Sequence, residues 1–322
     1  MVDTGIYAKA RRVTAALLSC LTTPVRRRYN INMDTDGRLK EMLAEAYGAR
    51  AEDIFRGFSV RRKTTFRANT LKTTHGRVRD ELVAAGIPFE EKNGAFAAEA
   101  DDYRRICALG IYGRGEIYMQ NLSSMLPPYA LGAEAGDNVL DMCAAPGGKT
   151  SQISALSGGR AFITACEKDR FRAERMKHNF ALLGVKRTNV LVSDALSLDP
   201  AMKFDRVLLD APCTGSGTVT PSSPGKFSEK LLSSCVKLQR RLIMRALELL
   251  KSGGTLVYST CSLLPVENDG VASLVLGSAD PVPAGGIPEG ASLLPSSVPG
   301  ALLIAPDEYY EGFFVAKFVK RR

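Results

Sequence analysis

The chain has 322 residues, 45% of them hydrophobic and 24% charged, with a formal net charge of +9, which suggests two domains around buried cores and excludes disorder as the main state. No apolar run reaches the roughly 18 residues that a membrane-spanning helix needs, so we expect a soluble protein with no membrane partner. With two distant histidines and no CxxC pair among seven scattered cysteines, the chain has almost no ligands for a zinc site and few candidates for a Ser/His hydrolytic triad, and we expect no metal.

Residues 1–36 are predicted to be an N-terminal extension. The first 31 residues are rich in arginine and contain one acid, Asp3, which leaves an organellar targeting segment as an open alternative. Otherwise the scattered cysteines and the absence of a signal peptide predict a reduced protein in the cytoplasm. We expect this protein to be a monomer.

Residues 37–115 are predicted to form a small α+β domain. Apolar residues recur first with helical spacing and then with strand-like alternation, and Gly86-Ile87-Pro88 ends a second helix. The expected elements are a helix at Gly37–Tyr47, a strand at Thr64–Thr70, a helix at Gly76–Ala85, and short strands near Phe89 and Phe96.

Most of the positive charge lies in the first third of the chain. Residues 1–115 contain 21 Lys and Arg against 14 Asp and Glu, whereas residues 116–322 contain 22 against 20. Between Ile54 and Arg79 there are eight basic residues, no acidic one and three interleaved phenylalanines. The run indicates either a surface that binds a polyanion or a solvated basic face, and by itself it leaves both interpretations open.

Residues 116–322 are predicted to form a larger α/β domain, because strand, loop and helix alternate repeatedly. Strands joined by crossover helices favour a parallel, doubly wound sheet. Residues 277–300, rich in Pro, Gly and Ser, are expected to be a long surface loop, and Phe313–Val319 an apolar edge strand. The other expected strands are Asn138–Met142, Ala161–Cys166, Asn189–Val192, Arg206–Asp210 and Thr255–Thr260, and the expected helices are Thr150–Ser157, Arg170–Leu183 and Glu229–Lys251.

The first strand of this domain runs into a glycine-containing loop and then a helix. In a doubly wound sheet this turn is where a nucleotide-like cofactor binds, and glycines there let a ligand approach the backbone. A phosphate-binding P-loop is one interpretation, but Cys143 occupies the position of its first glycine and Pro146 lacks a backbone N–H. The other is a loop that binds S-adenosylmethionine. The candidate cofactor-binding residues of the loop are Cys143, Ala144, Ala145, Pro146, Gly147, Gly148 and Lys149.

Acidic residues follow four successive strands: Asp141, Glu167, Asp194 and Asp210. Glu167, at the end of the second strand, suits ribose hydroxyls, and Asp194 suits an adenine amino group. Asp210 suits either the methionine amine of the cofactor or the substrate. Any one of these acids alone is typical of a solvated strand end, but four around one crevice favour a site for S-adenosylmethionine, which needs hydrogen-bond acceptors.

Two cysteines follow neighbouring strands, Cys213 in Asp210-Ala-Pro-Cys213 and Cys261 in Tyr258-Ser-Thr-Cys261. Both belong to the rim where the ligand crevice is expected. Methylation of carbon 5 of a pyrimidine needs such residues, because a thiolate must add at carbon 6 and an acid must stabilise the charge that develops at nitrogen 3. A nucleophilic thiol, an aspartate and a second thiol that assists release fit Cys261, Asp210 and Cys213.

The segment from about Tyr118 onward resembles the RsmB/NSUN family of RNA cytosine-5 methyltransferases. The matching blocks are Asp141-Met-Cys-Ala-Ala-Pro-Gly-Gly-Lys-Thr150, Asp210-Ala-Pro-Cys213, Tyr258-Ser-Thr-Cys-Ser262, Glu267-Asn268 and Gly312-Phe-Phe-Val-Ala-Lys317. The resemblance implies a Rossmann-like methyltransferase domain, S-adenosylmethionine as cofactor, the cysteine matching Cys261 as nucleophile, and the one matching Cys213 in product release. DNA cytosine-5 methyltransferases use the cysteine of the Pro-Cys block instead, so the presence of both thiols favours RNA.

Upstream, Arg67-Ala-Asn-Thr-Leu-Lys72 and Gly115–Ser124 resemble the accessory RNA-binding region of the same family. Two departures concern the substrate pocket: Leu303 stands where the family has Arg, and Val219–Phe227 matches poorly. The resemblance favours RNA contact by the basic run, with candidate residues Arg61, Arg62, Lys63, Arg67 and Lys72.

The leading hypothesis is therefore an RNA cytosine-5 methyltransferase that acts on an unstacked cytosine of structured RNA, with rRNA favoured over tRNA. One alternative is a P-loop NTPase-like nucleotide-binding protein. Another is a non-catalytic RNA-binding assembly factor, which need not retain both rim cysteines.

Overall fold

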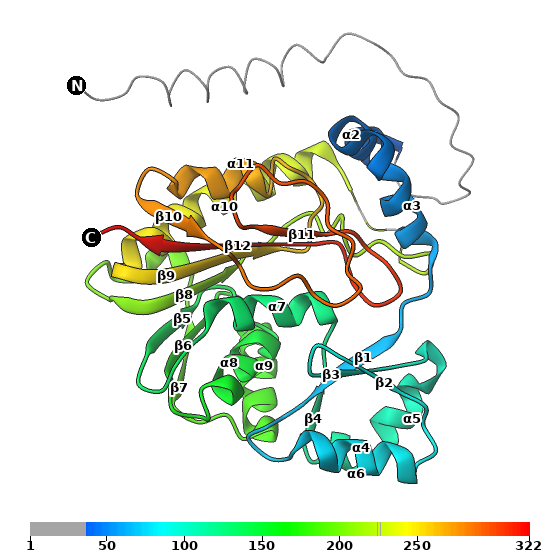
Figure 1. Cartoon of the computed structure of the whole chain (residues 1–322). Helices are drawn as coiled ribbons and strands as arrows, with labels where there is room; N and C mark the ends of the chain where they lie inside the picture. Colours follow the sequence, from blue (N-terminus) through cyan, green and yellow to red (C-terminus); the bar gives the residue numbers. More distant parts are fainter. Residues whose placement is uncertain (1–36, 224, 226) are drawn as a thin grey trace, which may run out of the picture. The chain divides into compact units, whose positions relative to one another are not determined.

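The computed structural model describes residues 37–223, 225 and 227–322, which belong to one compact unit (Figure 1). The predicted N-terminal extension, with the targeting alternative for residues 1–31, lies outside the described residues. None of the described helices is long and apolar enough to cross a membrane.

The larger sheet has eight strands in the order β10-β12-β9-β8-β5-β6-β7, and β11 also pairs with β12. The central strands are all parallel to one another, and β10, β11 and β12 form antiparallel pairs. The predicted doubly wound, Rossmann-like fold is confirmed. The parallel strands are β5 (Asn138–Asp141), β6 (Phe162–Glu167), β7 (Thr188–Val192), β8 (Phe204–Asp210) and β9 (Leu250–Thr260), followed by β10 (Ala279–Val282), β11 (Leu302–Ile304) and β12 (Phe313–Lys320).

Helices cover both faces of this sheet. Figure 1 shows α7 (Leu122–Leu131), α8 (Gly148–Leu156) and α9 (Arg170–Leu183) on one side, and α10 (Glu229–Leu249) and α11 (Asp269–Ala272) on the other. From the centre, β5, β6 and β7 follow one another in one direction, whereas β8 and β9 follow in the opposite direction. The chain therefore changes direction between β5 and β8, and a ligand crevice is expected beyond the carboxyl ends of these two strands.

Local sequence sets the ends of the long helices. Asp169 caps α9 by accepting a hydrogen bond from Arg172 N, and Gly184, at a φ of 70°, ends that helix. The sequence interpretation misses α7, because Pro127 and Pro128 lie inside it and lack the N–H that a helix uses. Most residues of α7 are buried, so packing outweighs the two missing hydrogen bonds.

β12 is an interior strand, which corrects the expectation of an edge strand at Phe313–Val319. It pairs with β9 on one side and with β10 and β11 on the other. β10 also lies within residues 277–300, which were expected to be loop throughout. The first four residues of β12 are all buried, so its continuous apolar run reflects burial of both faces and not the half-burial of an edge.

The smaller sheet has four antiparallel strands in the order β2-β3-β1-β4. Its core includes Phe66 and Phe96, whose rings stack with centroids 5.5 Å apart. β4 lies beyond residue 115, so this sheet takes its last strand from the segment that was assigned to the larger domain. The elements are β1 (Thr64–Ala68), α4 (His75–Ala84), β2 (Glu90–Lys92), β3 (Ala95–Ala98), α5 (Tyr103–Ala108), α6 (Gly110–Gly113) and β4 (Ile117–Met119).

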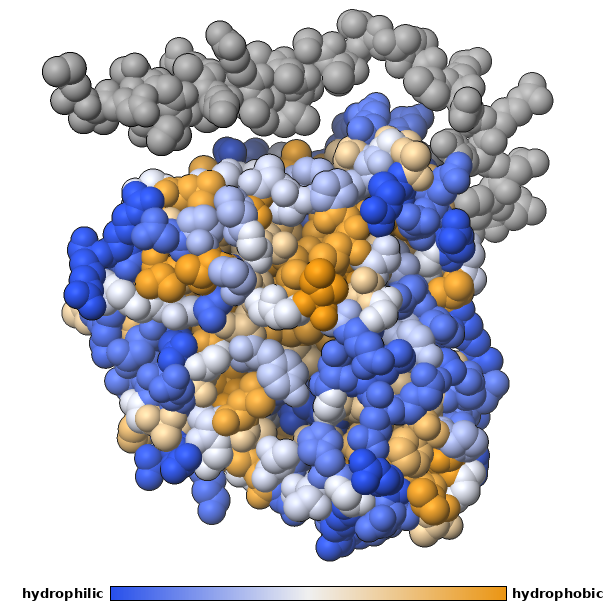
Figure 2. All heavy atoms as spheres, in the orientation of Figure 1, coloured by the Kyte–Doolittle hydropathy of each residue, from blue (hydrophilic) through white to orange (hydrophobic). Residues whose placement is uncertain are grey.

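The first two described helices, α2 (Gly37–Tyr47) and α3 (Ala51–Ser59), contact loops around the larger sheet. Tyr47 OH donates a hydrogen bond to Leu263 O at 2.5 Å, and Arg50 Nη2, from the turn between the two helices, donates one to Leu293 O at 3.0 Å. The predicted bounds of α2 are confirmed, whereas α3 was not expected. Figure 2 shows hydrophilic side chains over much of the visible face, with hydrophobic side chains in separate groups between them.

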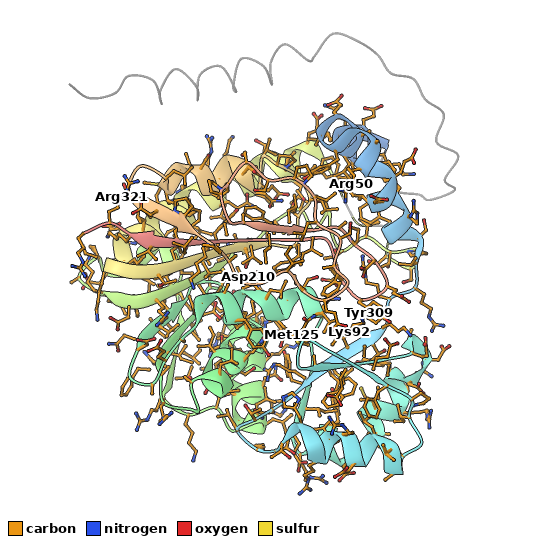
Figure 3. All side chains as sticks on the ribbon, viewed as in Figure 1. Arg50, Lys92, Met125, Asp210, Tyr309 and Arg321 are labelled. Atoms are coloured by element: carbon orange, nitrogen blue, oxygen red, sulfur yellow. The ribbon has the colours of Figure 1, made fainter. Side chains whose placement is uncertain are left out.

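Tyr309, in the loop before β12, joins this loop to the smaller sheet. Its hydroxyl donates to Glu90 Oε2 at 2.7 Å, and Lys92 Nζ lies 4.4 Å from its ring centroid (Figure 3). The smaller sheet is thereby attached directly to the segment that leads into the centre of the larger one.

Candidate active site

The two predicted reactive cysteines lie next to each other at the crevice. Cys213 follows β8 and Cys261 follows β9, and these strands are parallel neighbours with Asp210 paired to Ser259. The two sulfur atoms are 3.2 Å apart, and both side chains are half-buried. Gly217 N donates a hydrogen bond to Cys261 O at 2.9 Å, which ties the loop after Cys213 to the end of β9. Both thiols can therefore reach the same small substrate group.

The Cys213 thiol holds its proton tightly. Its hydrogen bond with Cys261, its burial and the negative charge of Glu267 raise the pKa of Cys213 well above the usual range. A thiol with a raised pKa is mostly un-ionised at neutral pH, and its thiolate is a strong base. A raised pKa thus makes Cys213 less suited to the initial attack.

Asp210 forms an ion pair with Lys149, a residue that the sequence had placed in the cofactor loop. Lys149 Nζ lies 2.7 Å from Asp210 Oδ2 and also donates to Ser124 Oγ at 2.7 Å. Asp210 Oδ1 accepts a hydrogen bond from Ser259 Oγ at 2.7 Å. Figure 3 places Asp210 beside α7 near the centre of the molecule. The sequence interpretation misses this pair, since the neighbouring positions of β5 and β8 follow only from the sheet order.

The predicted cofactor loop, Cys143–Lys149, joins β5 to α8. Gly147 has a φ of 101°, which favours glycine. A Cβ on Gly147 would lie 2.8 Å from Phe180 Cε1, and one on Gly148 would lie 2.8 Å from Tyr118 Cε1. These glycines therefore allow the loop to pack against protein side chains, in addition to any ligand that the loop binds.

The hydrogen bonds of this loop disfavour a phosphate cradle. Ala144 N donates to Cys166 O at 3.0 Å, and Gly147 N donates to Ala144 O at 2.7 Å. Pro146 has no N–H, and the Lys149 ammonium is paired with Asp210. A P-loop needs a series of free backbone N–H groups directed at the phosphates, whereas here those of Ala144 and Gly147 bond within the protein and Pro146 has none.

Asp141 and its loop neighbour Cys143 lie at the end of β5. Asp141 Oδ2 accepts a hydrogen bond from Thr150 Oγ1 at 2.7 Å, whereas its Oδ1 is buried without a partner. Burial raises the pKa of Asp141 to about 6. Burial, followed by the charge of Asp141, also raises the pKa of Cys143 well above its usual range, so Cys143 is an unreactive thiol.

The other two predicted acids lie at the ends of the next strands. Glu167 is buried, accepts a hydrogen bond from Asp169 N at 2.9 Å and pairs with Arg172 at 3.2 Å. Asp194 is exposed and accepts a hydrogen bond from Leu196 N at 2.9 Å. The fold thus places Asp141, Glu167, Asp194 and Asp210 at the carboxyl ends of successive parallel strands.

Arg67, one of the five predicted RNA contacts, is buried inside the protein. It is 4% exposed and donates hydrogen bonds to Gln120 Oε1, Ser151 Oγ and Gly148 O at 2.9, 2.8 and 3.2 Å. Its guanidinium lies 5.2 Å from the Tyr118 ring centroid. Burial lowers the pKa of Arg67 to about 10. In this conformation Arg67 holds β1 against the start of α8 and does not present its charge to solvent.

Arg62 also makes internal contacts. Its guanidinium donates to Gly217 O, Thr218 O and Val219 O at 3.4, 3.3 and 3.1 Å. It therefore holds the beginning of the poorly matched stretch Val219–Phe227 in place. The other departure, Leu303, is 1% exposed in β11, so an apolar side chain suits its surroundings.

The three remaining basic residues lie nearer to solvent but have partners. Arg61, with a side chain 67% exposed, pairs with Asp101, and Lys63 pairs with Glu99 at 2.5 Å. Lys72 Nζ donates to the carbonyl oxygens of Arg114 and Leu182 at 2.9 and 2.6 Å. RNA contact by these residues stays a prediction. No group of three or more His, Cys, Asp and Glu that could hold a metal occurs among the described residues.

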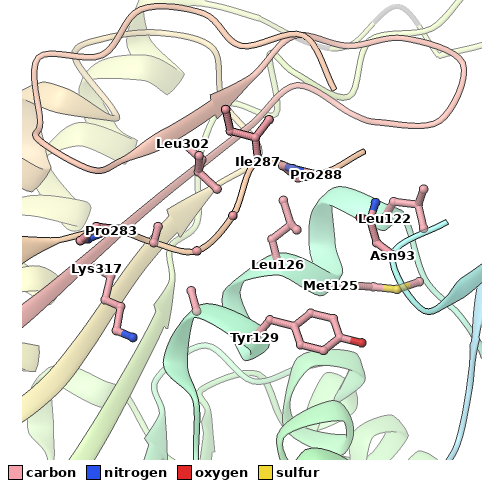
Figure 4. Close-up of a pocket in the computed structure, with 14 residues that line it drawn as sticks. Asn93, Leu122, Met125, Leu126, Tyr129, Pro283, Ile287, Pro288, Leu302 and Lys317 are labelled. Carbon is pink, nitrogen blue, oxygen red and sulfur yellow. The ribbon is translucent and has the colours of Figure 1, made fainter. Parts of the chain in front are cut away.

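A cavity of about 400 Å³ lies away from the cysteines, between α7 and the loop that contains Pro283 and Pro288 (Figure 4). Apolar side chains such as Leu126 and Ile287 form most of its wall, and Lys317 is also part of its lining. None of the predicted catalytic or cofactor-binding residues lines this cavity.

A family model described as 16S rRNA methyltransferase RsmB/F matches residues 128–319. The chain is 31% identical over 275 residues to a Bacillus subtilis (strain 168) protein described as a probable ribosomal RNA small subunit methyltransferase B, an alignment that covers 83% of this chain. The chain spans 61% of that relative's length.

The chain is also 30% identical over 322 residues to a tRNA (cytosine(72)-C(5))-methyltransferase of Pyrococcus horikoshii, which covers 92% of this chain and 79% of that protein. Among solved structures, a methyltransferase homologue from Pyrococcus horikoshii superimposes with a TM-score of 0.77 at 33% sequence identity. That similarity covers 87% of this chain and 93% of the other.

Proposed function

Because the chain belongs to the RsmB/F family of 16S rRNA methyltransferases, we propose that it transfers a methyl group from S-adenosylmethionine to carbon 5 of a cytosine in structured RNA. The observation that supports this reaction best is the 3.2 Å separation of the Cys213 and Cys261 sulfurs beside Asp210. We propose rRNA as the substrate, in line with the family description, and tRNA as the second candidate.

We propose that Asp141, Glu167, Asp194 and the Cys143–Lys149 loop hold the cofactor. The buried, unpartnered Asp141 Oδ1 at the end of β5 fits a cationic ligand group such as the amine of S-adenosylmethionine. When bound, S-adenosylmethionine supplies an electrophilic methyl group. Glu167, buried at the end of β6, suits the ribose hydroxyls, and Asp194 suits the adenine amino group.

The Cys261 thiolate attacks carbon 6 of the cytosine, and a bond forms between Cys261 Sγ and that carbon. Asp210, held by Lys149 and Ser259, must carry a proton at this step, because only a carboxylic acid can donate to nitrogen 3 of the ring and stabilise the negative charge that develops there. Carbon 5 then becomes nucleophilic and accepts the methyl group. Water takes the proton that leaves carbon 5, and the electron pair of that C–H bond expels Cys261 Sγ from carbon 6, which restores the Cys261 thiolate. Cys213 assists this release by donating a hydrogen bond from its S–H to the departing sulfur.

Substituting each cysteine separately tests these roles. Cys261→Ala is expected to abolish methylation, whereas Cys213→Ala is expected to accumulate an RNA–protein adduct that survives denaturing gel electrophoresis. Cys107→Ala, at a half-buried cysteine in α5, is the matched control and should leave methylation unchanged. Activity in Cys261→Ala, or an adduct formed by that variant, would refute the assignment.

The two alternatives predict different results in the same assays. A non-catalytic RNA-binding assembly factor would bind RNA without methylating it and would form no adduct in any variant. A P-loop protein would bind ATP with Mg²⁺, which the hydrogen bonds of Ala144 N and Gly147 N and the pairing of Lys149 with Asp210 disfavour.

A further inference from the structure

Glu267 is a fully buried carboxylate that lies behind the two cysteines. Its Oε1 accepts hydrogen bonds from Thr214 N at 2.9 Å and Gln239 Nε2 at 3.0 Å. Its Oε2 accepts from Thr214 Oγ1 and Ser262 Oγ, each at 2.5 Å. All four donors are neutral groups, so hydrogen bonds compensate the cost of burying this side chain.

The donors to Glu267 come from both cysteine-bearing loops. Thr214 directly follows Cys213, and Ser262 directly follows Cys261. The hydroxyls of these two residues meet on the same oxygen atom, Oε2. One carboxylate therefore anchors the residue next to each sulfur, although the two cysteines lie 48 positions apart in the sequence.

The backbone around Glu267 is itself held in place. Tyr258 OH, from β9, donates to Glu267 O at 2.5 Å. The next residue, Asn268, donates from Nδ2 to Ser262 O at 2.8 Å and accepts from Thr260 Oγ1. These bonds fix the turn after β9, so the Glu267 carboxylate is a rigid reference point for both loops.

We propose that Glu267 is the positioning residue that sets the separation of the Cys213 and Cys261 sulfurs. Its importance for catalysis rests on the function proposed above, whereas its effect on the geometry of the thiols does not. The reaction requires both sulfurs to reach one cytosine ring, and a misplacement of about 1 Å in such a site can cost roughly 100-fold in rate. Glu267 acts through Thr214 and Ser262 and is buried away from the substrate.

A thiol-bridging reagent tests the geometry without RNA. Dibromobimane becomes fluorescent when two nearby thiols displace its two bromides, and mass spectrometry identifies the bridged pair. Removing the Glu267 charge also lowers the pKa of Cys213, so the bridging rate is divided by the rate at which monobromobimane labels the same cysteines. We expect this ratio for the Cys213–Cys261 bridge to be at least tenfold lower in Glu267→Ala than in the wild type. Glu267→Gln should recover part of the rate, because its carbonyl oxygen still accepts hydrogen bonds. Glu248→Ala, at an exposed acid near the end of α10, is the matched control and should bridge at the wild-type rate.

Milder variants cover the case in which Glu267→Ala does not fold. Thr214→Val and Ser262→Ala each remove one hydroxyl donor and should each slow bridging severalfold. Wild-type bridging rates in both variants, or in folded Glu267→Ala, would overturn the proposal.

Kinetics separate this inference from the proposed function. In a methylation assay, Glu267→Gln should lower kcat by tenfold or more and leave the KM for RNA within twofold, because Glu267 positions the thiols and does not bind RNA. An unchanged kcat in Glu267→Gln would also overturn the positioning role. If the wild type has no methyltransferase activity but bridging depends on Glu267, the positioning role stands and the proposed reaction fails.

Discussion

The Lys149 ammonium lies 2.7 Å from the Asp210 carboxylate, and this ion pair joins the cofactor loop after β5 to the end of β8. The two side chains are only 13% and 26% exposed. Burial opposes the charge of Lys149, but the neighbouring Asp210 outweighs it and raises the pKa of the lysine. The pair therefore keeps a cation next to Asp210, the aspartate that we propose acts on the substrate base.

We expect Asp210→Asn to lower the pKa of Lys149. The substitution removes the main attraction for the ammonium while the burial remains, so the neutral amine becomes more favourable. Competitive acetylation, followed by mass spectrometry across alkaline pH, should label Lys149 at lower pH in the variant. The exposed Lys186 provides the reference. A Lys149 labelling curve identical to that of the wild type would show that Asp210 does not control its charge.

Arg67 is expected to contribute to stability and not to the salt dependence of RNA binding. Arg67→Met leaves the acceptors on Gln120, Gly148 and Ser151 without their donor, which should lower the free energy of unfolding by about 2–4 kcal/mol. Urea unfolding measures the change. A loss below about 0.5 kcal/mol, typical of a surface substitution, would be incompatible with the buried contacts.

Arg61 is expected to contribute to the salt dependence of RNA binding and not to stability. Its side chain is 67% exposed, so Arg61→Glu should change stability little. If this part of the surface contacts phosphates, the plot of log affinity for RNA against log salt concentration should become less steep by roughly one to two units. Arg321→Glu, at another exposed arginine, is the control and should keep the wild-type slope. Equal slopes for both variants would indicate that Arg61 belongs to a solvated basic face.

Asp141 is expected to make the protein less stable as the pH rises from about 4 to about 6. Burial raises its folded-state pKa to about 6, above the value near 4 in an unfolded chain. Between these values the folded state binds more protons, so the free energy of unfolding falls with increasing pH, by up to roughly 3 kcal/mol. In urea unfolding at a series of pH values, the free energy of unfolding of the wild type minus that of Asp141→Asn should show this decline, because the other carboxylates contribute equally to both proteins. The same slope in both proteins would assign the effect to another group.

Ligand-induced thermal shifts distinguish the two interpretations of the Cys143–Lys149 loop. S-adenosylmethionine at about 100 times its Kd should stabilise the folded protein by roughly 2.7 kcal/mol and raise Tm. ATP with Mg²⁺ should leave Tm unchanged, because Ala144 N and Gly147 N bond within the protein and the Lys149 ammonium is paired with Asp210. Glu167→Gln should weaken the shift, with Cys107→Ala as the unaffected control. A shift with ATP and none with S-adenosylmethionine would reverse the interpretation.

The sequence predicts the central sheet well, because buried parallel strands are continuous apolar runs bounded by turns. The predicted strands at 138–142, 161–166, 189–192, 206–210 and 255–260 all coincide with observed strands. The rule that ligands bind at the carboxyl ends of such strands also predicts that Cys213 and Cys261 approach each other, and the structure confirms that placement.

The features that the sequence does not predict are contacts between side chains that lie far apart in the chain. Lys149 could be placed in a loop, but its pairing with Asp210 depends on β5 and β8 being neighbours. Arg62 and Arg67 belong to a basic run with no acid, and the pattern alone cannot show that their guanidinium groups point to backbone carbonyls and buried side chains. A run of basic residues in a sequence should therefore be interpreted as a polyanion-binding surface only after the structure has shown that its side chains are exposed.

The interior position of β12 has a consequence for biosynthesis. β9, whose end carries Cys261, leaves the ribosome before Phe313–Lys320, the segment that covers its free edge. During that interval a nascent chain presents an open, apolar strand edge, the kind of surface that pairs with other chains. Pairing along this edge of β9, beside Cys261, therefore has to wait until Phe313–Lys320 has been synthesised.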